Sequence, residues 1–314
     1  MTQPRVDVGV VTFNTAELAV TALRRLFDVD HGVDVRLLVR DNGSSDGTAD
    51  AIARSVPEAD LDVGLDNLGF AAGVNRLIEK SDAPWFLALN SDAWPEPGAL
   101  TTLVRAAEAH PEAAAVAPRL LRPDGTLEQS THPFPSLTVA TLTGLGLTRV
   151  IGGRKARAML LEPAWSCDEA RPVDWAVGAA LLMRRDALDD VGGFDERFFM
   201  YVEDLDWCWR ARQRGWEVRI EPDAVVRHVG NASGESAYGR ERSAAYLRNT
   251  YRFYRRHHGR LSTATFRLLN LVGGMRLYAQ FRLRHEPAVA DYWRAQLRAH
   301  VAPIGGADGP PAPR

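Results

Sequence analysis

The chain has 314 residues, enough to bury one large hydrophobic core or two smaller ones. A hydrophobic content of 46% and a charged content of 25% are ordinary for a soluble globular protein, and no apolar stretch reaches the ~20 residues needed to span a bilayer. The net charge of −2 hides an uneven distribution, because residues 240–300 contain 13 arginines and only three acidic residues.

The first 120 residues alternate between two periodicities. Short apolar runs predict strands, and each is followed by a segment with apolar residues at helical spacing. The predicted strands cover residues 6–12, 33–40, 61–65, 85–89 and 113–121, and the predicted helices cover residues 48–56, 71–80, 98–110 and a segment from about 16. This alternation predicts an α/β fold with a mostly parallel sheet and helices on both faces. Ligands of such sheets bind beyond the carboxyl ends of the strands.

The second half is less regular. Residues 122–165 are rich in Gly, Thr and Pro, and a connection of this length is typical of a functional or mobile loop. Residues 173–185 have strand or buried-helix character, and residues 202–215 predict a helix with acids in its first turn and arginines in its last. Two short strands, in "WEVRIEP" and "AVVRHV", are expected next, followed by basic helices from about residue 235 to 300.

Polar clusters follow four successive predicted strands. They are "TFN" at 12–14, "DNGSSDGT" at 41–48, "NLGFAAGVN" at 67–75 and "NSD" at 90–92. The second cluster has a structural alternative, a turn in which Ser45 or Asp46 caps the next helix. Four such clusters at four strand ends predict a binding site at this edge of the sheet.

These clusters, followed by "GGFDERFFMYVEDLDWCWR" and then "RH", resemble family 2 of the glycosyltransferases in both content and order. The resemblance covers residues 6 to about 230, and it is strongest to the rhamnosyltransferase-like branch. It implies an inverting enzyme with a GT-A fold, a Rossmann-like mixed, mostly parallel sheet flanked by helices. The implied catalytic domain covers 1–235, with a nucleotide-sugar half at 1–120 and an acceptor half at 121–235. A basic helical region at 236–300 and a disordered tail at 301–314 complete the chain.

An inverting transfer must stabilise the charge on the departing diphosphate and remove a proton from the attacking hydroxyl. A divalent cation meets the first need, and the resemblance implies that Asp92 and His228 bind it. The family's Asp-x-Asp motif is reduced here to Asn90-Ser91-Asp92, and oxygen-rich coordination suits Mg²⁺ or Mn²⁺. The alternatives are a turn-capping role for Asp92 and a structural role for His228.

A carboxylate meets the second need, and the resemblance places the general base at Asp204. Glu203 is expected beside it, in catalysis or in contact with the acceptor. Glu203, Asp204 and Asp206 share one helical turn, so mutual repulsion raises their pKa values while the helix amino terminus lowers them. The alternative is that these acids only complement the helix dipole.

The remaining site residues also come from the resemblance. The nucleotide-sugar is expected to contact Thr12, Asn14, Asp41, Asp46, Asn67, Gly69, Asn75, Asn90 and Asp92. The acceptor is expected to contact Trp175, Gly178 and Glu203. Two alternatives stay open, since Asn75 could be a helix-surface amide and Trp175 could be buried in the core.

The sequence thus predicts a glycosyltransferase that moves rhamnose from dTDP-rhamnose to a lipid-linked or cell-envelope glycan. The alternatives are a UDP-sugar transferase for galactofuranose or N-acetylhexosamine, and a catalytically silent binding module. The amino-terminal residues lack signal-peptide features, so we expect a cytoplasmic protein. Residues 240–300 suit either an anionic membrane surface on the inner face of the plasma membrane or a packed helical subdomain. Nucleic acid is not an expected partner, because the rest of the chain is acidic.

Overall fold

A computed structural model describes residues 3–147, 167–230 and 242–305 of the chain. The described residues divide into two compact units. The first contains residues 3–132 and 167–230, and the second contains residues 133–147 and 242–305. Residues 148–166 of the expected functional loop, 231–241 at the start of the basic region and 306–314 of the expected tail lie outside the described residues.

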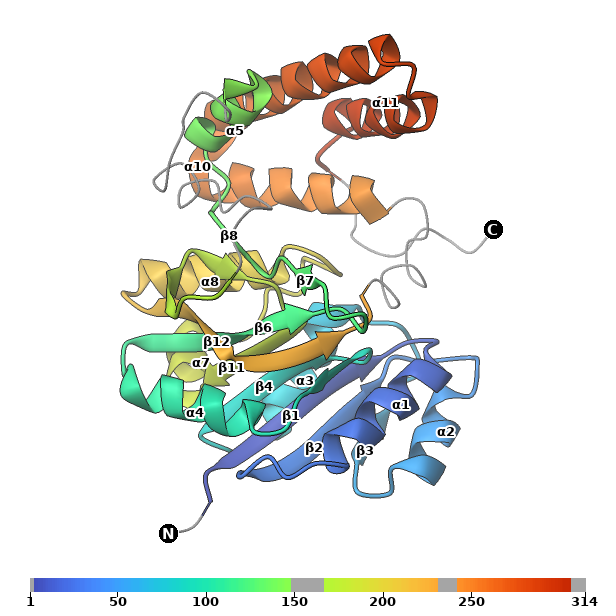
Figure 1. Ribbon diagram of the computed structural model, residues 1–314, viewed down its shortest axis with the longest axis vertical. Coiled ribbons are helices and arrows are strands. Elements are labelled where there is room, and N and C mark those ends of the chain that lie inside the picture. The colour runs from blue at the N-terminus through green and yellow to red at the C-terminus, as the bar shows by residue number, and fades with distance from the viewer. Residues whose placement is uncertain (1–2, 148–166, 231–241, 306–314) are drawn as a thin grey trace. The chain divides into compact units, whose positions relative to one another are not determined.

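A mixed sheet forms the centre of the first unit (Figure 1). Its strand order is β3-β2-β1-β4-β11-β6-β12-β5, with β7 beside β6 and β9 beside β12. The bounds of these strands are β1 Arg5–Thr12, β2 Asp34–Asp41, β3 Asp60–Val63, β4 Trp85–Asn90, β5 Ala93–Pro95, β6 Ala113–Leu121, β7 Leu127–Glu128, β9 Arg171–Val173, β11 Ala180–Arg184 and β12 Glu217–His228. Strands β1 to β4 pair in parallel, whereas β11 runs antiparallel to both β4 and β6. A separate two-stranded sheet joins β8, Thr131–His132, to β10, Trp175–Ala176.

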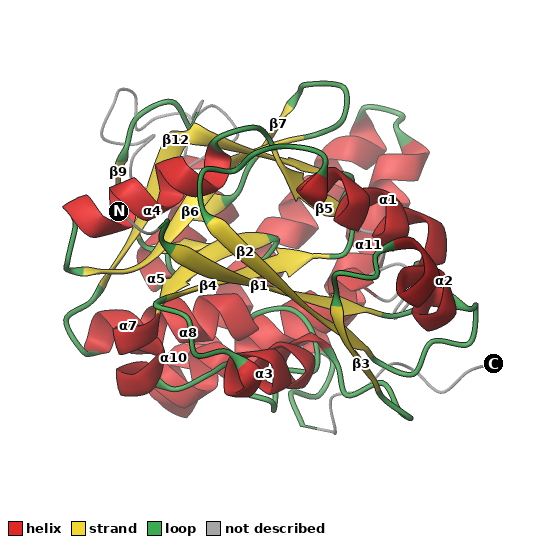
Figure 2. Ribbon diagram, turned by 90° about the horizontal axis from the view of Figure 1, so that it is seen from below, coloured by secondary structure: helices red, strands yellow, loops and turns green. Residues whose placement is uncertain are grey.

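Helices cover both faces of the central sheet (Figure 2). One face packs against α1, α2 and α4 in a single hydrophobic core, and α3, α7 and α8 lie on the other face. The bounds are α1 Ala16–Phe27, α2 Thr48–Ser55, α3 Phe70–Lys80, α4 Ala99–Ala109, α7 Arg185–Val191 and α8 Glu203–Gln213. Successive side chains of β1 point to opposite faces of the sheet. Val6, Val8 and Val10 therefore enter the core shared with α1, α2 and α4. Val11 lies on the other face, close to Gly73 of α3.

The predicted GT-A-like architecture is confirmed, and most predicted elements of the first 120 residues are found within one or two residues of their expected bounds. One prediction about strands was wrong, and a short strand of the central sheet was not predicted. The two short strands expected after residue 215 form one strand, β12, which continues through a register shift between Glu221 and Val225. The three-residue strand β5 was missed, because its apolar pattern is too short to show a period.

The second unit consists of helices. Its helices are α5 Leu137–Gly144, α10 Arg242–Leu283 and α11 Pro287–Val301, so the helix prediction for the basic region is confirmed. Helix α10 is broken at Gly259, whose φ of 78° is not helical. Helix α5, which sequence analysis placed in the acceptor half, packs here on α10, where Gly144 and Gly273 bring the two backbones together.

Side chains join the helices of the second unit to one another. Tyr251 of α10 contacts His300 of α11 through a hydrogen bond of 2.6 Å. The guanidinium of Arg267 lies 5.2 Å from the centre of the Tyr251 ring and donates to the carbonyls of His300 and Ala302 at the end of α11. Arg267 thus satisfies carbonyls that the last turn of a helix leaves without partners.

Candidate active site

Three of the predicted site loops are bonded into one frame at the carboxyl ends of β1, β2 and β3. Asp41, at the end of β2, accepts from Thr12 Oγ1 of β1 at 3.0 Å and from Ser44 at 2.6 and 2.9 Å. Both Asp41 and Thr12 are buried. The structure thus brings these two predicted residues together, with the carboxylate of Asp41 holding the loop that follows its own strand.

Asn14 and Asp46 extend this frame. The side-chain oxygen of Asn14 accepts from the Ser45 backbone at 2.8 Å. Asp46 accepts from the backbone of Ala16 at the start of α1 and from the backbone and hydroxyl of Thr48 at the start of α2. Asp46 therefore accepts hydrogen bonds at the starts of two helices, which agrees with the alternative that this residue caps the next helix.

The loop before α3 is tied to the same frame. Asn67 accepts from the Gly69 backbone at 2.9 Å, and the amide of buried Asn42 donates to the Gly69 carbonyl at 2.9 Å. Gly69 has φ 86°, and a Cβ at this position would lie 2.3 Å from the Phe199 carbonyl oxygen. Only glycine therefore lets this loop approach the segment that leads into α8.

The second cluster combines residues from three strands. Asp92 follows β4 and His228 ends β12, and the pairing of β12 with β5 sets His228 opposite Ala93. His228 Nε2 lies 3.2 Å from Asp92 Oδ1 and 3.2 Å from the Asn90 amide nitrogen. His228 Nδ1 lies 3.0 Å from a carboxylate oxygen of Glu128, on β7. The predicted metal ligands Asp92 and His228 are thus adjacent, although 136 positions separate them along the sequence.

His228 is flanked by negative charge on both ring nitrogens. Burial acts to lower the pKa of His228, but the hydrogen bonds with Asp92 and Glu128 outweigh it and raise the pKa to about 9. A pKa of about 9 favours the imidazolium form of this ring, which both carboxylates stabilise. A metal ion at Nε2 would replace the proton on that nitrogen, because a coordinating histidine must be neutral there.

The Asp92–His228 pair fits a divalent cation. Asp92 is buried, and its Oδ2 has no hydrogen-bond partner among the described residues. The 3.2 Å separation of Oδ1 and Nε2 is close to the separation of about 3 Å between neighbouring ligands in an octahedral magnesium site. No group of three or more His, Cys, Asp or Glu residues arranged for a metal occurs in the described part of the chain. A cation bound by this pair would have coordination positions left for oxygen atoms of a ligand and of water, as is usual for Mg²⁺.

The predicted base lies at the start of α8. The Asp204 carboxylate accepts from the Gly178 backbone at 2.8 Å and from the Leu205 backbone at 2.7 Å. Burial raises the pKa of Asp204 to about 6, although these backbone hydrogen bonds act to lower it. A carboxylate with this pKa is ionised at neutral pH and is a stronger base than an ordinary aspartate.

Glu203, the neighbour of Asp204, is more deeply buried. Its Oε2 has no hydrogen-bond partner among the described residues. Burial, together with the charge of Asp204, raises the pKa of Glu203 well above its ordinary value. Such a carboxyl group has a hydrogen-bonding position left for a bound hydroxyl.

A short path of backbone contacts links the two clusters. Gly178 donates to Asp204, and the carbonyl of the next residue, Ala179, accepts from the Asn90 backbone at 2.9 Å. Asn90 in turn contacts His228 through its side chain. Adjacent Cα atoms are about 3.8 Å apart, so the strand ends of β4 and β11 bring the base to the same edge of the sheet as the Asp92–His228 pair.

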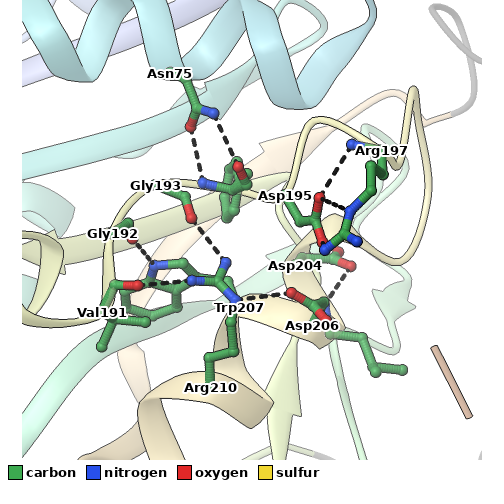
Figure 3. A network of polar contacts seen from close by, with 12 residues as sticks. Asn75, Val191, Gly192, Gly193, Asp195, Arg197, Asp204, Asp206, Trp207 and Arg210 are labelled. Carbon is green, nitrogen blue, oxygen red and sulfur yellow. Dashed lines mark hydrogen bonds and ion pairs between the residues drawn. The ribbon is translucent and has the colours of Figure 1, made fainter. Parts of the chain in front are cut away.

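A network behind α8 holds its first turn in place (Figure 3). Arg210 binds Asp206 at 2.8 Å and donates to the carbonyls of Val191 and Gly193. The buried Trp207 donates to the Gly192 carbonyl at 2.8 Å. Asp206 therefore belongs to the support of the helix.

Asn75 takes part in the same support. Its amide donates to the carbonyl of Phe194 at 2.9 Å and to Glu196 at 3.0 Å, and its oxygen accepts from the Phe194 backbone at 2.8 Å. Asn75 therefore holds the loop between α7 and α8, and its expected contact with the nucleotide-sugar stays a prediction. Sequence analysis missed this role because the partners lie about 120 positions away.

Two of the three expected acceptor residues, Gly178 and Trp175, differ in their surroundings. Gly178 lies against Asp204, as its hydrogen bond shows. Trp175 is only 5% exposed and stacks on His132 with ring centres 4.9 Å apart. This burial favours the core alternative for Trp175, since neither face of its ring is open to a sugar.

Glu128 is the residue at this site that sequence analysis missed. It stands alone in the sequence after the turn "RPDGT", with no motif around it. The available signal was that turn, which predicts a hairpin that returns the chain along β6, and β7 does pair with β6. The position of β12 on the other side of β6 could not be read from the sequence.

Comparisons with known proteins identify relatives of this chain. The model of "Glycosyl transferase family 2" matches residues 7–192, and that of "Glycosyl transferase family 21" matches residues 162–256. An N-acetylglucosaminyl-diphospho-decaprenol L-rhamnosyltransferase of Mycobacterium tuberculosis is 35% identical over 244 residues, which are 71% of this chain and 76% of that protein. Rhamnosyltransferase WbbL of Escherichia coli is 26% identical over 132 residues, 41% of this chain and 45% of that protein.

A solved structure supports the fold alone. The mannosyltransferase PcManGT of Pyrobaculum calidifontis, solved in complex with GDP-Man and Mn²⁺, superposes with a TM-score of 0.57 at 18% sequence identity. The superposition covers 96% of this chain and 85% of that chain.

Proposed function

The chain belongs to glycosyltransferase family 2. We propose that it transfers L-rhamnose from dTDP-rhamnose to a polyprenyl-linked glycan and inverts the configuration at the anomeric carbon. The similarity to a rhamnosyltransferase that acts on a diphospho-decaprenol carrier supports both the sugar and the acceptor class. The observation that carries the proposal is the meeting of Asp204 with the Asp92–His228 pair at one edge of the sheet.

Donor binding is assigned to the bonded loops after β1, β2 and β3. In this proposal, Thr12, Asn14, Asp41, Asp46, Asn67, Gly69 and Asn90 form the wall of the nucleotide-sugar site. Because Asn14, Asp41, Asp46 and Asn67 accept hydrogen bonds from backbone N–H groups of these loops, they hold the loop backbones in a fixed geometry before the donor arrives. Loops that are already fixed lose less conformational entropy when the donor binds.

Asp92 and His228 would hold a divalent cation, Mg²⁺ or Mn²⁺, between the protein and the donor diphosphate. When bound, the cation neutralises the charge that develops on the leaving diphosphate. Glu128 fixes the His228 ring by accepting from Nδ1, which leaves Nε2 directed at Asp92. This arrangement follows the general rule that a carboxylate orients a ligating histidine through its second nitrogen.

Asp204 is proposed to take the proton from the attacking acceptor hydroxyl. The Gly178 and Leu205 backbone N–H groups fix its carboxylate, and its pKa of about 6 leaves it ionised at neutral pH. Glu203 is proposed to accept a hydrogen bond from the acceptor through its unpartnered oxygen. The acceptor would thus be oriented by one acid and deprotonated by the other.

The substitution Asp204→Asn tests this assignment. We expect transfer to fall by roughly 100- to 10,000-fold, the usual contribution of a general base, while the dissociation constant for the donor stays within a factor of about three. Transfer is measured with radiolabelled donor and binding by calorimetry. Asp50→Asn, an exposed carboxylate in the first turn of α2, is the matched control. Unchanged transfer by the Asp204 variant would remove this residue from the base role.

A further inference from the structure

The second half of α10 carries an exposed apolar stripe that the fold of its unit does not use. Leu261 is 83% exposed, Leu268 59%, Met275 46% and Leu283 81%. These residues follow one another at intervals of seven or eight positions, which is about two helical turns, so they lie on one side of the helix. We call these four residues the α10 stripe.

The opposite side of the same helix makes the internal contacts of the unit. Phe266 is buried and stacks on Tyr254 with ring centres 4.2 Å apart. Gly273 lies against α5, and Gly274 lies against Leu297 and His300 of α11. The helix therefore already has a packing face, and the α10 stripe is a second apolar face directed away from these contacts.

Arginines lie near the α10 stripe. Arg260, Arg282 and Arg284 are all exposed beside its two ends. The surrounding residues 240–300 have an excess of ten positive charges, from 13 arginines and three acids. A surface that joins leucines to exposed arginines fits a partner with an apolar layer beneath a negatively charged layer.

This charge pattern decides between the two simplest occupants of the stripe. A second copy of the chain would cover the leucines, but it would also bring two strongly basic regions together, which costs free energy. An anionic lipid bilayer accepts the leucines among its acyl chains and the arginines among its phosphates. Among the described residues, no helix has both the length and the apolar character needed to cross a bilayer, so such contact would be interfacial.

We infer that the α10 stripe is the membrane-docking face of the protein and lies parallel to an anionic bilayer surface, with Arg260, Arg282 and Arg284 at the level of the lipid phosphates. The inference rests on the proposed function in one respect, because a polyprenyl-linked acceptor is confined to a membrane. It goes beyond that function by assigning one face of one helix to the contact.

Vesicle flotation tests the inference with the purified full-length protein. The vesicles contain either equal parts of phosphatidylglycerol and phosphatidylcholine or phosphatidylcholine alone. The test variant combines Leu261→Ser, Leu268→Ser and Leu283→Ser, and Leu65→Ser is the matched control because this leucine of the first unit is 96% exposed. A second variant combines Arg282→Gln with Arg284→Gln, and its control is Arg54→Gln on the exposed surface of α2.

We expect the wild type and both controls to bind the anionic vesicles and to bind phosphatidylcholine at least about tenfold more weakly. Both test variants should lose at least about tenfold in affinity for the anionic vesicles, since each removes apolar area or charge from the contact. Equal melting temperatures of all variants exclude unfolding as the cause. If serine replacement lowers the melting temperature, Leu268→Ser alone and the arginine variant carry the test.

Two results would overturn the inference. One is equal binding of anionic vesicles by the wild type and the stripe variants. The other is a wild-type dimer in analytical ultracentrifugation that the leucine substitutions dissociate, which would assign the stripe to a second copy. The assay contains neither donor nor acceptor, so a failure of the proposed sugar transfer leaves its outcome unchanged.

Discussion

Three acids share the first turn of α8, and each has a different environment. Asp206 is neutralised by Arg210, whereas Asp204 accepts hydrogen bonds from two backbone N–H groups. Glu203 is buried, and one of its oxygens has no hydrogen-bond partner in the part of the chain that the structure describes. Their sequence positions could be predicted to carry chemistry, but their separate roles could not, because these depend on burial and on a contact between Asp204 and Gly178, which lies 26 positions away. Of the three, Asp204 combines a fixed geometry with a pKa near neutrality.

The pKa of Asp204 predicts the acid limb of the pH profile. Only the ionised form can accept a proton, so kcat/KM should decrease about tenfold per pH unit below a midpoint near pH 6. The profile is measured from initial rates with the metal concentration kept saturating. A flat profile between about pH 5 and pH 7 would contradict the assignment of the base.

Replacing Glu203 by glutamine should stabilise the protein by an amount that depends on pH. The pKa of Glu203 is raised in the folded state, so its ionisation destabilises the fold. This loss of stability is absent below the unfolded pKa and is complete once the pH has risen through the folded pKa. The melting temperature of Glu203→Gln, relative to wild type, should therefore increase from about pH 5 to about pH 8. Scanning calorimetry measures this difference, with Glu58→Gln as an exposed control. A difference in melting temperature that stays constant with pH would show that ionisation of Glu203 does not destabilise the native protein.

At the scale of elements, the site depends on how β12 is held. Its end lies between β5 and β6, and β7 extends the neighbouring β6 so that Glu128 reaches His228. The sequence showed an apolar pattern for β12 but no sign of its single continuous course or of its neighbours. Antiparallel and parallel partners across the sheet are long-range choices, and periodicity reports only the local strand.

Glu128 should affect metal affinity through His228. Glu128→Ala should weaken Mn²⁺ binding by about 10- to 100-fold in the presence of dTDP, because the imidazole loses the carboxylate that orients it. Glu128→Gln keeps a hydrogen-bond acceptor and should recover part of this loss. Electron paramagnetic resonance of free Mn²⁺ measures the affinity without any turnover. Equal affinities for the two variants and the wild type would leave Glu128 with a purely structural role.

At the scale of the whole molecule, the described residues form two units, one built on a mixed sheet and the other made of helices rich in arginine. The alternation of strands and helices in the first 120 residues was readable because each element is long and strongly periodic, as α1 and β1 show. The packing of α5 on α10 was not readable, because it depends on Gly144 and Gly273 meeting across more than a hundred residues. The proposed domain boundaries remain a prediction.

The central claim is that Asp92, His228 and Asp204 serve one donor and one acceptor at one edge of the sheet. A crystal structure of the protein with dTDP and Mn²⁺, recorded at the manganese absorption edge, tests it most directly. We predict one anomalous peak bonded to Asp92, His228 Nε2 and the diphosphate, in the crevice that also contains the Asp204 carboxylate. A nucleotide bound elsewhere, or a peak that touches neither Asp92 nor His228, would contradict the account.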